Sequence, residues 1–157
     1  MTRIIMHGCN GKMGQVISGL LAADQEAEIV AGVDAFDDGH NAYPVFKKLE
    51  ECKVDADCII DFSAAAAVDG LLDYCEERKL PCVLCTTGLS PEQLERVREV
   101  SEKVAILRSA NMSLGINLLQ QILKKAADVL APAGFDIEII EKHHNLKVDA
   151  PSGTALA

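Results

Sequence analysis

Tryptophan is absent from this chain of 157 residues, and phenylalanine and tyrosine raise the aromatic content to only 4%. The hydrophobic fraction is nevertheless 49%, which excludes the polar composition of intrinsically disordered chains. A folded core must therefore be aliphatic, built from Ile, Val, Leu and Ala. The chain also lacks any run of the roughly 18 to 20 apolar residues that an α-helix needs to cross a bilayer. At this length we expect one domain, or one domain with part of another.

Positive charge is scarce. Lys and Arg number 15 against 24 Asp and Glu, so the net charge is −9 at pH 7 and the pI is about 4.8. An acidic surface repels nucleic acid and anionic membranes, and neither is predicted as a partner. Any anionic ligand must then be held by a local arrangement of donors and cations.

The first residues lack the profile of a secretory signal peptide and read as a short strand. We therefore expect a cytoplasmic protein whose cysteines stay reduced. Cys82 and Cys85 have the C-x-x-C spacing of redox and zinc sites, but residues 81–85 read as a buried strand, where side chains three apart point to opposite faces. We interpret them as core residues, like the cysteines at positions 9, 52, 58 and 75.

A glycine-rich turn joins the first predicted strand, residues 3–6, to the first predicted helix. In the spacing G-x-x-G-x-x-G, a variant of the dinucleotide fingerprint, Gly8 allows a tight turn, Gly11 lets a pyrophosphate come close, and Gly14 brings helix against strand. Such turns also occur without a ligand, so the motif alone leaves cofactor binding open. The helix is indicated by apolar residues at helical spacing: Met13, Val16, Ile17, Leu20 and Leu21.

An acid follows the second predicted strand, residues 28–33, in the position that favours a nicotinamide dinucleotide. Asp34 can accept hydrogen bonds from the adenosine ribose. The next residues, 35–38, contain no cation and include two more acids, which oppose a 2′-phosphate. We therefore favour NADH over NADPH as the cofactor, although Lys12 can still reach such a phosphate.

Strands and helices alternate along the first two thirds of the chain. Further strands are predicted at 57–61, 82–85 and 104–107, with helices over 64–79 and from Ser90, whose capping box includes Pro91 and Gln93. The type of the short element at 45–51 is left open. This rhythm predicts an α/β fold with a Rossmann-like, doubly wound parallel sheet, which binds ligands at the carboxyl ends of its strands. We assign residues 1–108 to this dinucleotide-binding domain.

Residues 109–157 are predicted to begin a second, α+β domain, which we expect to bind the substrate. A long helix carries an apolar face that includes Leu114, Leu118, Ile122, Val129 and Leu130, residues 132–134 stop it, and the alternation over 135–139 predicts a strand with one buried face. A polar cluster follows.

His143 can exchange a proton near neutral pH, and Lys147 can orient a carboxylate or give up a proton. A helix predicted over 152–157 has Gly153 at its start, where free N–H groups favour an anion. The cluster thus indicates a pocket that binds and protonates a small carboxylate. A basic loop with solvated histidines is the alternative. A metal site at His143 and His144 is discounted, because neighbours on a strand point apart and no further ligand completes the set.

In one-letter code, residues 141–155 read E-x-H-H-x-x-K-x-D-A-P-S-G-T-A. This run resembles the substrate-site motif of the 4-hydroxy-tetrahydrodipicolinate reductases (dihydrodipicolinate reductases), enzymes of lysine and diaminopimelate synthesis. The resemblance extends along the chain through segments in the family's order: Gly8-x-x-Gly11-x-Met13-Gly14, Asp61-Phe62-Ser63, Thr86-Thr87-Gly88 and Ala110-Asn111-x-Ser113-x-Gly115-x-Asn117.

The resemblance implies a role for each matching position. His143 and Lys147 are the implied catalytic acids, and His144, Gly153 and Thr154 the implied substrate-binding residues. The implied cofactor-binding residues come from four segments: Gly8, Cys9, Asn10, Gly11, Lys12, Met13, Asp34, Cys85, Thr86, Thr87, Ser109, Ala110, Asn111 and Met112.

The implied reaction is NAD(P)H-dependent reduction of a cyclic dicarboxylic acid, formed from 4-hydroxy-tetrahydrodipicolinate, to tetrahydrodipicolinate. Family members continue well beyond the position of Ala157, so we expect a truncated form of a full-length homotetramer. Two alternatives stay open: another nicotinamide-dependent dehydrogenase of an amino or hydroxy acid, and a non-catalytic module that binds NADH.

Overall fold

The computed structural model describes residues 1–37, 39–143, 145 and 150–156. The chain divides into two units, Met1–Ser109 and Ala110–Ala157. Across the described residues, no helix is long and apolar enough to cross a membrane. The assignment of 1–108 to cofactor binding and 109–157 to substrate binding stays a prediction.

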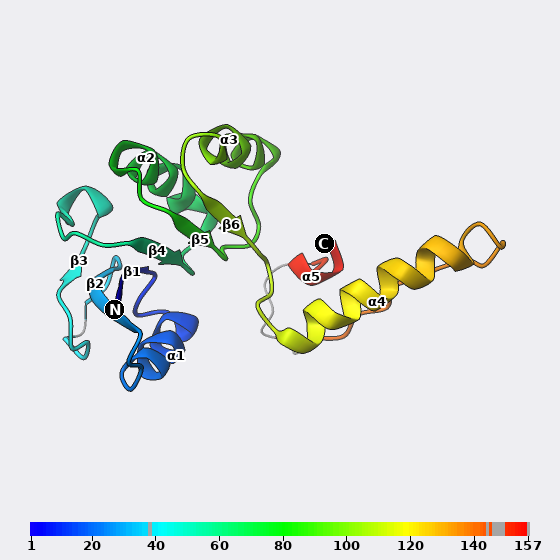
Figure 1. Cartoon of the computed structure of the whole chain (residues 1–157), viewed down its shortest axis with the longest axis horizontal. Coiled ribbons are helices and arrows are strands. Elements are labelled where there is room, and N and C mark those ends of the chain that lie inside the picture. The colour runs from blue at the N-terminus through cyan, green and yellow to red at the C-terminus, as the bar shows by residue number, and fades with distance from the viewer. Residues whose placement is uncertain (38, 144, 146–149, 157) are drawn as a thin grey trace. The chain divides into compact units, whose positions relative to one another are not determined.

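The first unit is built on a six-stranded sheet, shown in Figure 1. Its spatial order is β3-β2-β1-β4-β5-β6, and every neighbouring pair is parallel. This is a strand order of doubly wound nucleotide-binding folds, so the predicted Rossmann-like sheet is confirmed. The strands are β1 (Thr2–His7), β2 (Ala27–Val33), β3 (Val45–Phe46), β4 (Cys58–Asp61), β5 (Cys82–Leu84) and β6 (Ile106–Arg108).

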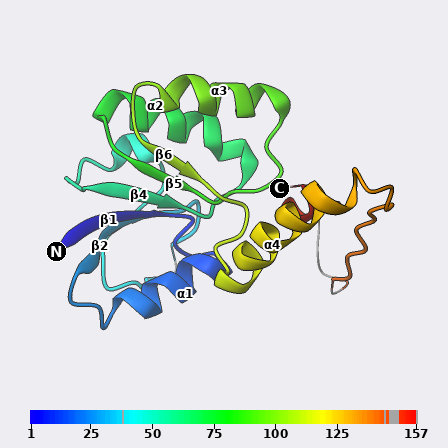
Figure 2. The ribbon, with the colours of Figure 1, turned by 45° about the vertical axis from the view of Figure 1, so that its right-hand side comes forward.

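Helices cover both faces of this sheet. In Figure 2, α2 (Val68–Arg78) and α3 (Pro91–Ser101) lie on one face and α1 (Lys12–Leu21) on the other. The predicted start of α3 is confirmed, because the Ser90 hydroxyl accepts from the Gln93 N–H and the Gln93 side chain accepts from the Ser90 N–H. The element at 45–51 is β3 followed by a 3-10 turn, η1 (Leu49–Glu51), and a second 3-10 turn, η2 (Ala65–Ala67), precedes α2.

The core of the unit is aliphatic, as the composition predicts. Ile5, Ile59 and Leu84 come from three neighbouring strands and are fully buried, and Leu71 and Leu72 of α2 are buried in the same cluster. Burial of this apolar surface is the main force that holds a helix against a sheet. The buried aromatic residue of the cluster is Tyr74, whose hydroxyl donates to the Cys52 carbonyl over 2.8 Å.

All six cysteines belong to the described residues and are free thiols. Cys82, the first residue of β5, and Cys85, which directly follows that strand, are both buried, which confirms that the C-x-x-C spacing marks core positions. Burial raises the pKa of the Cys85 thiol to about 11, with the nearby charge of Asp61 adding to the shift. Both effects disfavour the reactive thiolate near neutral pH.

The second unit contains α4 (Leu114–Leu130) and α5 (Gly153–Leu156). Ser113 caps α4 by accepting from the Ile116 N–H. The apolar face predicted for this helix is present but exposed, with exposed fractions from 38% to 86%: Leu114, Leu118, Ile122, Val129 and Leu130.

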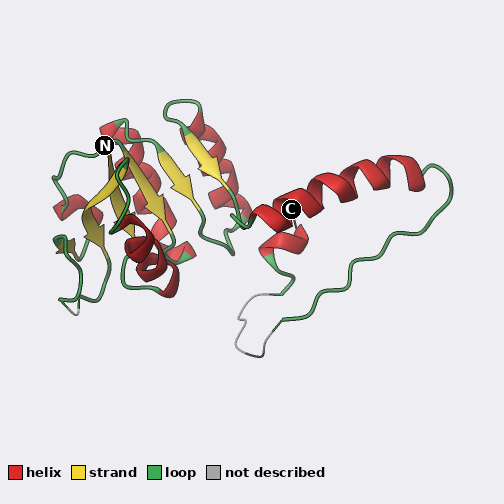
Figure 3. Ribbon diagram, turned by 60° about the horizontal axis from the view of Figure 1, so that its bottom comes forward, coloured by secondary structure: helices red, strands yellow, loops and turns green. Residues whose placement is uncertain are grey.

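The strand predicted at 135–139 is wrong. Residues 135–143 are extended but belong to no strand, and every residue from 131 to 140 is exposed (Figure 3). Alternation supplies one apolar face, but a strand also requires a neighbour for its backbone N–H and C=O groups. In the described part of this unit, no other segment pairs with 135–139.

Two glycines of α1 offer a matched test of the packing between helix and loop. A Cβ added at Gly14 would overlap the carbonyl oxygens of Gly8 and Cys9, whereas one added at Gly19 would meet nothing within 4 Å. We expect Gly14→Ala to lower the free energy of unfolding by about 1–3 kcal/mol through overpacking. Gly19→Ala should raise it by up to about 1 kcal/mol, because alanine favours the helix.

Urea denaturation of the two variants and the wild type measures both effects. Equal free energies of unfolding for the two variants would contradict the close approach at Gly14.

Candidate functional site

The turn after β1 is shaped by two close approaches. Gly8 has φ +78°, and a Cβ there would lie 2.6 Å from the Phe62 carbonyl oxygen, so a side chain is excluded by both conformation and space. Gly14 abuts the Gly8 carbonyl from the first turn of α1. The tight turn predicted at Gly8 and the close approach predicted at Gly14 are confirmed, and cofactor binding at Gly8 stays a prediction. Gly11 is exposed at the N-cap of α1, where a pyrophosphate could approach the free N–H groups of the helix start.

Asp34 follows β2 and is tied to this turn. Its Oδ2 accepts from the Asn10 N–H over 3.0 Å, and its Oδ1 accepts from the Phe36 N–H over 3.2 Å. The Asn10 amide in turn donates to the Phe36 carbonyl and accepts from Asn41 Nδ2 over 2.6 Å. The acid predicted to bind ribose and the loop predicted to bind pyrophosphate therefore meet in the folded chain.

Cys9 lies in the same turn and is fully buried. Burial, with the charge of Asp34 as the next cause, raises the pKa of its thiol to about 11. The thiol is therefore neutral at physiological pH, and it adds no negative charge where an anionic pyrophosphate is predicted. The neighbouring Lys12 and Met13, at the first turn of α1, are exposed.

A buried polar cluster lies where β1, β4 and β5 end. His7 Nδ1 is 2.8 Å from Asp61 Oδ1, and Thr86 Oγ1 donates to Asp61 Oδ2 over 2.6 Å. The Ser63 N–H donates to Asp61 Oδ1 over 3.2 Å. The His7 ring nitrogen is close to the carboxylate but not aligned for a hydrogen bond, so this contact is mainly electrostatic. Asp61 is 0% exposed, and His7 and Thr86 are each 6% exposed.

The charge state of Asp61 follows from two opposing effects. Burial raises the pKa of its carboxyl group, but the close His7 ring, together with hydrogen bonds from Ser63 and Thr86, outweighs burial and holds the pKa below its ordinary value of 3.8. Asp61 is therefore a buried carboxylate at neutral pH.

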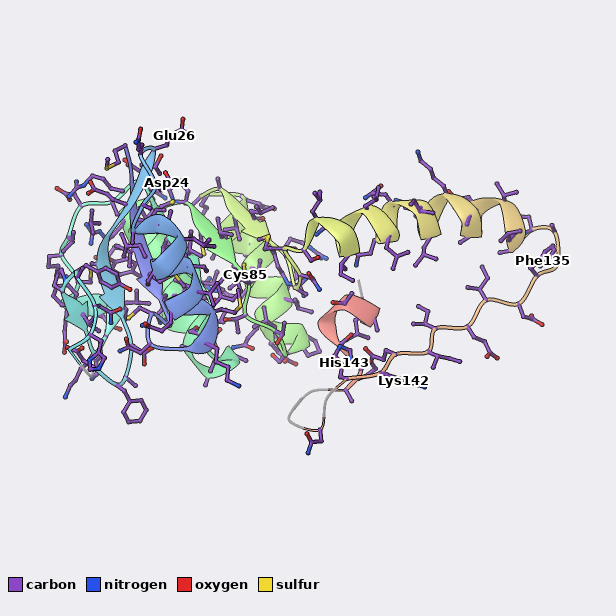
Figure 4. All side chains as sticks on the ribbon, turned by 90° about the horizontal axis from the view of Figure 1, so that it is seen from below. Asp24, Glu26, Cys85, Phe135, Lys142 and His143 are labelled. Atoms are coloured by element: carbon purple, nitrogen blue, oxygen red, sulfur yellow. The ribbon has the colours of Figure 1, made fainter. Side chains whose placement is uncertain are left out.

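The predicted cofactor residues after β5 and β6 fall in both units. Cys85 and Thr86 are buried, Thr87 is exposed, and the Ser109 N–H donates to the Leu84 carbonyl over 3.1 Å, all within the first unit. Ala110, Asn111 and Met112 belong to the second unit. Figure 4 labels Cys85 among the side chains of the first unit.

In the second unit, Glu141 connects the predicted acid to the predicted anion site. Glu141 Oε1 accepts from the Ser152 N–H over 2.8 Å, and its Oε2 lies 3.5 Å from His143 Nδ1. The Ser152 hydroxyl caps α5 by accepting from the Ala155 N–H over 3.1 Å, which confirms the predicted start of this helix. Asn111 Nδ2 donates to Thr154 Oγ1 over 3.0 Å. Figure 4 shows His143 and Lys142 at the end of the extended segment that begins at Phe135.

His144 and Lys147 lie outside the described residues, so the structure gives no geometry for them. Among the residues it does describe, no group of three His, Cys, Asp or Glu side chains is placed to hold a metal ion.

Sequence reasoning missed the contributions of His7, Asp61 and Glu141. Asp61 could have been found, because an acid that closes an otherwise apolar strand has to be satisfied by partners. The partner His7 carried no comparable signal. The link from Glu141 to Ser152 depends on how the chain folds back between them.

The depressed pKa of Asp61 gives stability a defined pH dependence. The stabilisation is fully present above the ordinary pKa of 3.8 and is lost as the pH falls through the lower folded-state value. Asp61→Asn removes one acceptor oxygen, and we expect it to lower the free energy of unfolding by about 1–3 kcal/mol at neutral pH. The difference from the wild type should shrink below a pH of about 4.

Urea denaturation at a series of pH values measures this difference. Glu77→Gln, which changes an exposed carboxylate on α2, is the control and should follow the wild-type curve. A difference between Asp61→Asn and the wild type that grows on acidification would contradict the assignment.

Comparison with known protein families identifies the chain. The family profile described as "Dihydrodipicolinate reductase, N-terminus" matches residues 2–112, and that described as "Dihydrodipicolinate reductase, C-terminus" matches residues 115–157. Proteins named 4-hydroxy-tetrahydrodipicolinate reductase from Clostridium novyi (strain NT) and Caldanaerobacter subterraneus subsp. tengcongensis are 53% and 54% identical over 99% of this chain. The chain spans 62% and 61% of the length of these two relatives.

Solved structures agree with this relationship. The chain is similar to the dipicolinate-bound dihydrodipicolinate reductase from Paenisporosarcina sp. TG-14, with 31% identity and a TM-score of 0.78 over 99% of this chain and 63% of that one. Scyllo-inositol dehydrogenase from Lactobacillus casei, solved with NAD(H), is 14% identical with a TM-score of 0.61 over 80% of this chain and 42% of that one, which shows likeness of fold alone. The two adjoining profiles and the identity to these relatives show that the chain belongs to the dihydrodipicolinate reductase family.

Proposed function

We propose that this chain carries the cofactor site and the proton-donating segment of an NAD(P)H-dependent 4-hydroxy-tetrahydrodipicolinate reductase. The observation that carries the proposal is that two profiles of one family match nearly the whole chain, in order and without overlap. The substrate class is a small cyclic dicarboxylate, which the dipicolinate bound to the similar Paenisporosarcina enzyme supports. The product is tetrahydrodipicolinate, an intermediate of lysine and diaminopimelate synthesis.

The residues of the first unit fit a dinucleotide. Gly8 and Gly14 leave no space for side chains on the turn, and Asp34 is hydrogen-bonded to the turn through Asn10. When bound, a reduced nicotinamide supplies the hydride. The protein positions the pyrophosphate against the turn and the ribose hydroxyls against Asp34, as in other doubly wound folds. Thr86 and Thr87 contribute from the carboxyl end of β5.

The second unit supplies the proton and holds the substrate. His143 is exposed and lies beside Glu141, which also binds the Ser152 N–H, so one carboxylate links the acid to the start of α5. We assign proton donation to His143 and Lys147, and contacts with the substrate carboxylates to His144, Gly153 and Thr154. These roles rest on the motif at 141–155 and on membership of the family.

The cofactor preference proposed here is for NADH. Asp34 carries a negative charge where a 2′-phosphate would lie, and the residues that follow it, 35–37, contain no cation. Like charges at hydrogen-bonding distance disfavour binding. Lys12 is the exposed cation nearest in sequence to the turn, and it acts in the opposite direction.

The proposed full-length form is a cytoplasmic homotetramer. Support comes from the exposed apolar face of α4 and from the exposed Phe135, Ile137 and Ile139. Exposed apolar patches of this kind mark surfaces that another polypeptide segment covers.

The test of the function is NADH oxidation with 4-hydroxy-tetrahydrodipicolinate made in situ from pyruvate and aspartate semialdehyde. The assay uses this chain and a fusion in which it is followed by the region that extends the Clostridium novyi relative past the matched part. In the active form, we expect His143→Ala and Lys147→Ala each to lower kcat by about 10² or more, as for a lost proton donor. NADH binding should not change.

Lys142→Ala, one position before His143, is the control and should keep wild-type turnover. Wild-type kcat in both the His143 and Lys147 variants would remove their roles. NADH binding without turnover in either wild-type chain would instead favour a non-catalytic module or another dehydrogenase.

The preference for NADH has its own test. We expect Asp34→Ala to weaken NADH binding about ten-fold, as for the loss of one or two charge-assisted hydrogen bonds, and to narrow the preference over NADPH. The control is Asp24→Ala at the opposite end of β2, where Asp24 Oδ1 accepts from the N–H groups of Glu26 and Ala27 (Figure 4). Isothermal titration calorimetry measures the binding of both cofactors. A wild-type preference for NADPH would refute the assignment.

A further inference from the structure

The cluster of His7, Asp61 and Thr86 occupies the topological switch point of the sheet. His7 is the last residue of β1 and Asp61 the last of β4, and they are partners in the parallel register of these strands. From β1 the sheet extends to β2 and β3 on one side, and from β4 to β5 and β6 on the other. Open α/β sheets bind their ligands in the crevice at this point.

Burying a carboxylate at this point costs free energy, because the charged group loses its contact with water. Asp61 is fully buried and ionised, and each of its oxygens is engaged: Oδ1 by His7 and the Ser63 N–H, and Oδ2 by the Thr86 hydroxyl. For stability alone, well-packed apolar residues serve as well as a buried charged group with its partners. The Asp61 carboxylate also fixes orientation, because the groups that donate hydrogen bonds to it must point toward its oxygens.

The donors fixed by Asp61 belong to segments that shape the proposed cofactor site. Thr86 has committed its only hydroxyl proton to Asp61, which sets the side-chain rotamer within the segment Cys85–Thr87. A backbone hydrogen bond joins the same two segments, because the Cys85 N–H donates to the Asp61 carbonyl over 3.0 Å. On the other side, the Phe62 N–H donates to the His7 carbonyl over 3.0 Å, and the Phe62 carbonyl adjoins Gly8.

We infer that Asp61 is a positioning residue for the nicotinamide half of the cofactor: it acts through Thr86, while the His7 ring lies beside its other carboxylate oxygen. The inference rests on the proposed function, because it concerns the cofactor of that reaction. Asp61 is fully buried and acts on the cofactor through the Cys85–Thr87 segment that it orients. The adenosine half, proposed to bind at Asp34 after β2, lies on the other side of β1 in the sheet order and should not depend on Asp61.

The test compares binding of the whole cofactor with binding of each of its two halves. Binding of NADH, of reduced nicotinamide mononucleotide and of ADP-ribose is measured by calorimetry for the wild type, Asp61→Asn, Thr86→Val, Thr86→Ser and the double variant. We expect Asp61→Asn and Thr86→Val each to weaken NADH and the mononucleotide about ten-fold or more, a common result of misplacing a bound group. ADP-ribose should bind all variants as it binds the wild type.

Two comparisons separate positioning from a general loss of structure. Thr86→Ser keeps the hydroxyl and should bind NADH and the mononucleotide with wild-type affinity. The double variant should bind them no more weakly than Thr86→Val does, because both changes break the same connection. Tyr74→Phe is the control: it removes the buried hydrogen bond to Cys52 and should lower the Tm without changing the affinity for any of the three ligands.

Three results would overturn the inference: wild-type affinity for the mononucleotide in Asp61→Asn, equal weakening of mononucleotide and ADP-ribose, or fully additive effects in the double variant. Failure of the wild type to bind NADH and both fragments would instead refute the proposed function, and the inference with it.

Discussion

The parallel pairing of β1 with β4 is the constraint on which the arrangement of the first unit depends. It places His7 beside Asp61 and brings the turn at Gly8 against the carbonyl of Phe62. The chain leaves these two strands in opposite directions across the sheet, and in open α/β sheets the loops that follow such strands form the ligand-binding crevice. The proposed cofactor residues of the first unit follow the carboxyl ends of β1, β2, β5 and β6.

The two units differ in how far their apolar residues are buried. In the first, the sheet and the helices α2 and α3 bury a continuous aliphatic cluster, and α3 is fixed at its start by a complete capping box. In the second, α4 has a regular apolar face that is exposed along its length. Helix formation requires only local hydrogen bonds and a cap, so α4 forms with that face uncovered. A β-strand has no such independence, and residues 135–139 stay extended without pairing.

Much of the first unit could be predicted from the sequence because its signals are local. Glycine spacing, alternation of strand and helix, and the Ser90 to Gln93 cap each depend on a few neighbouring residues, and together they predict the parallel sheet. The turn at Gly8 and the position of Asp34 follow from the same pattern.

What the sequence could not predict depends on distant partners. Nothing near His7 indicates that it faces Asp61, and nothing near Glu141 indicates that it binds the Ser152 N–H. The strand predicted at 135–139 failed for the related reason that alternation reports an apolar face but not the neighbour that would pair with it. The roles assigned to His144 and Lys147 rest on the motif at 141–155 alone, because both residues lie outside the described residues.

The parallel sheet also has a consequence for how the chain reaches its fold. The Arg3 N–H and the Asp57 carboxylate, which meet beside the central strand pair, are 54 positions apart in sequence. No hairpin can bring such strands together, so closure of the central pair must wait until a long intervening segment has collapsed. We therefore expect the pairing that places His7 beside Asp61 to form late in folding. Strand edges that stay unpaired during folding are prone to pair with other chains.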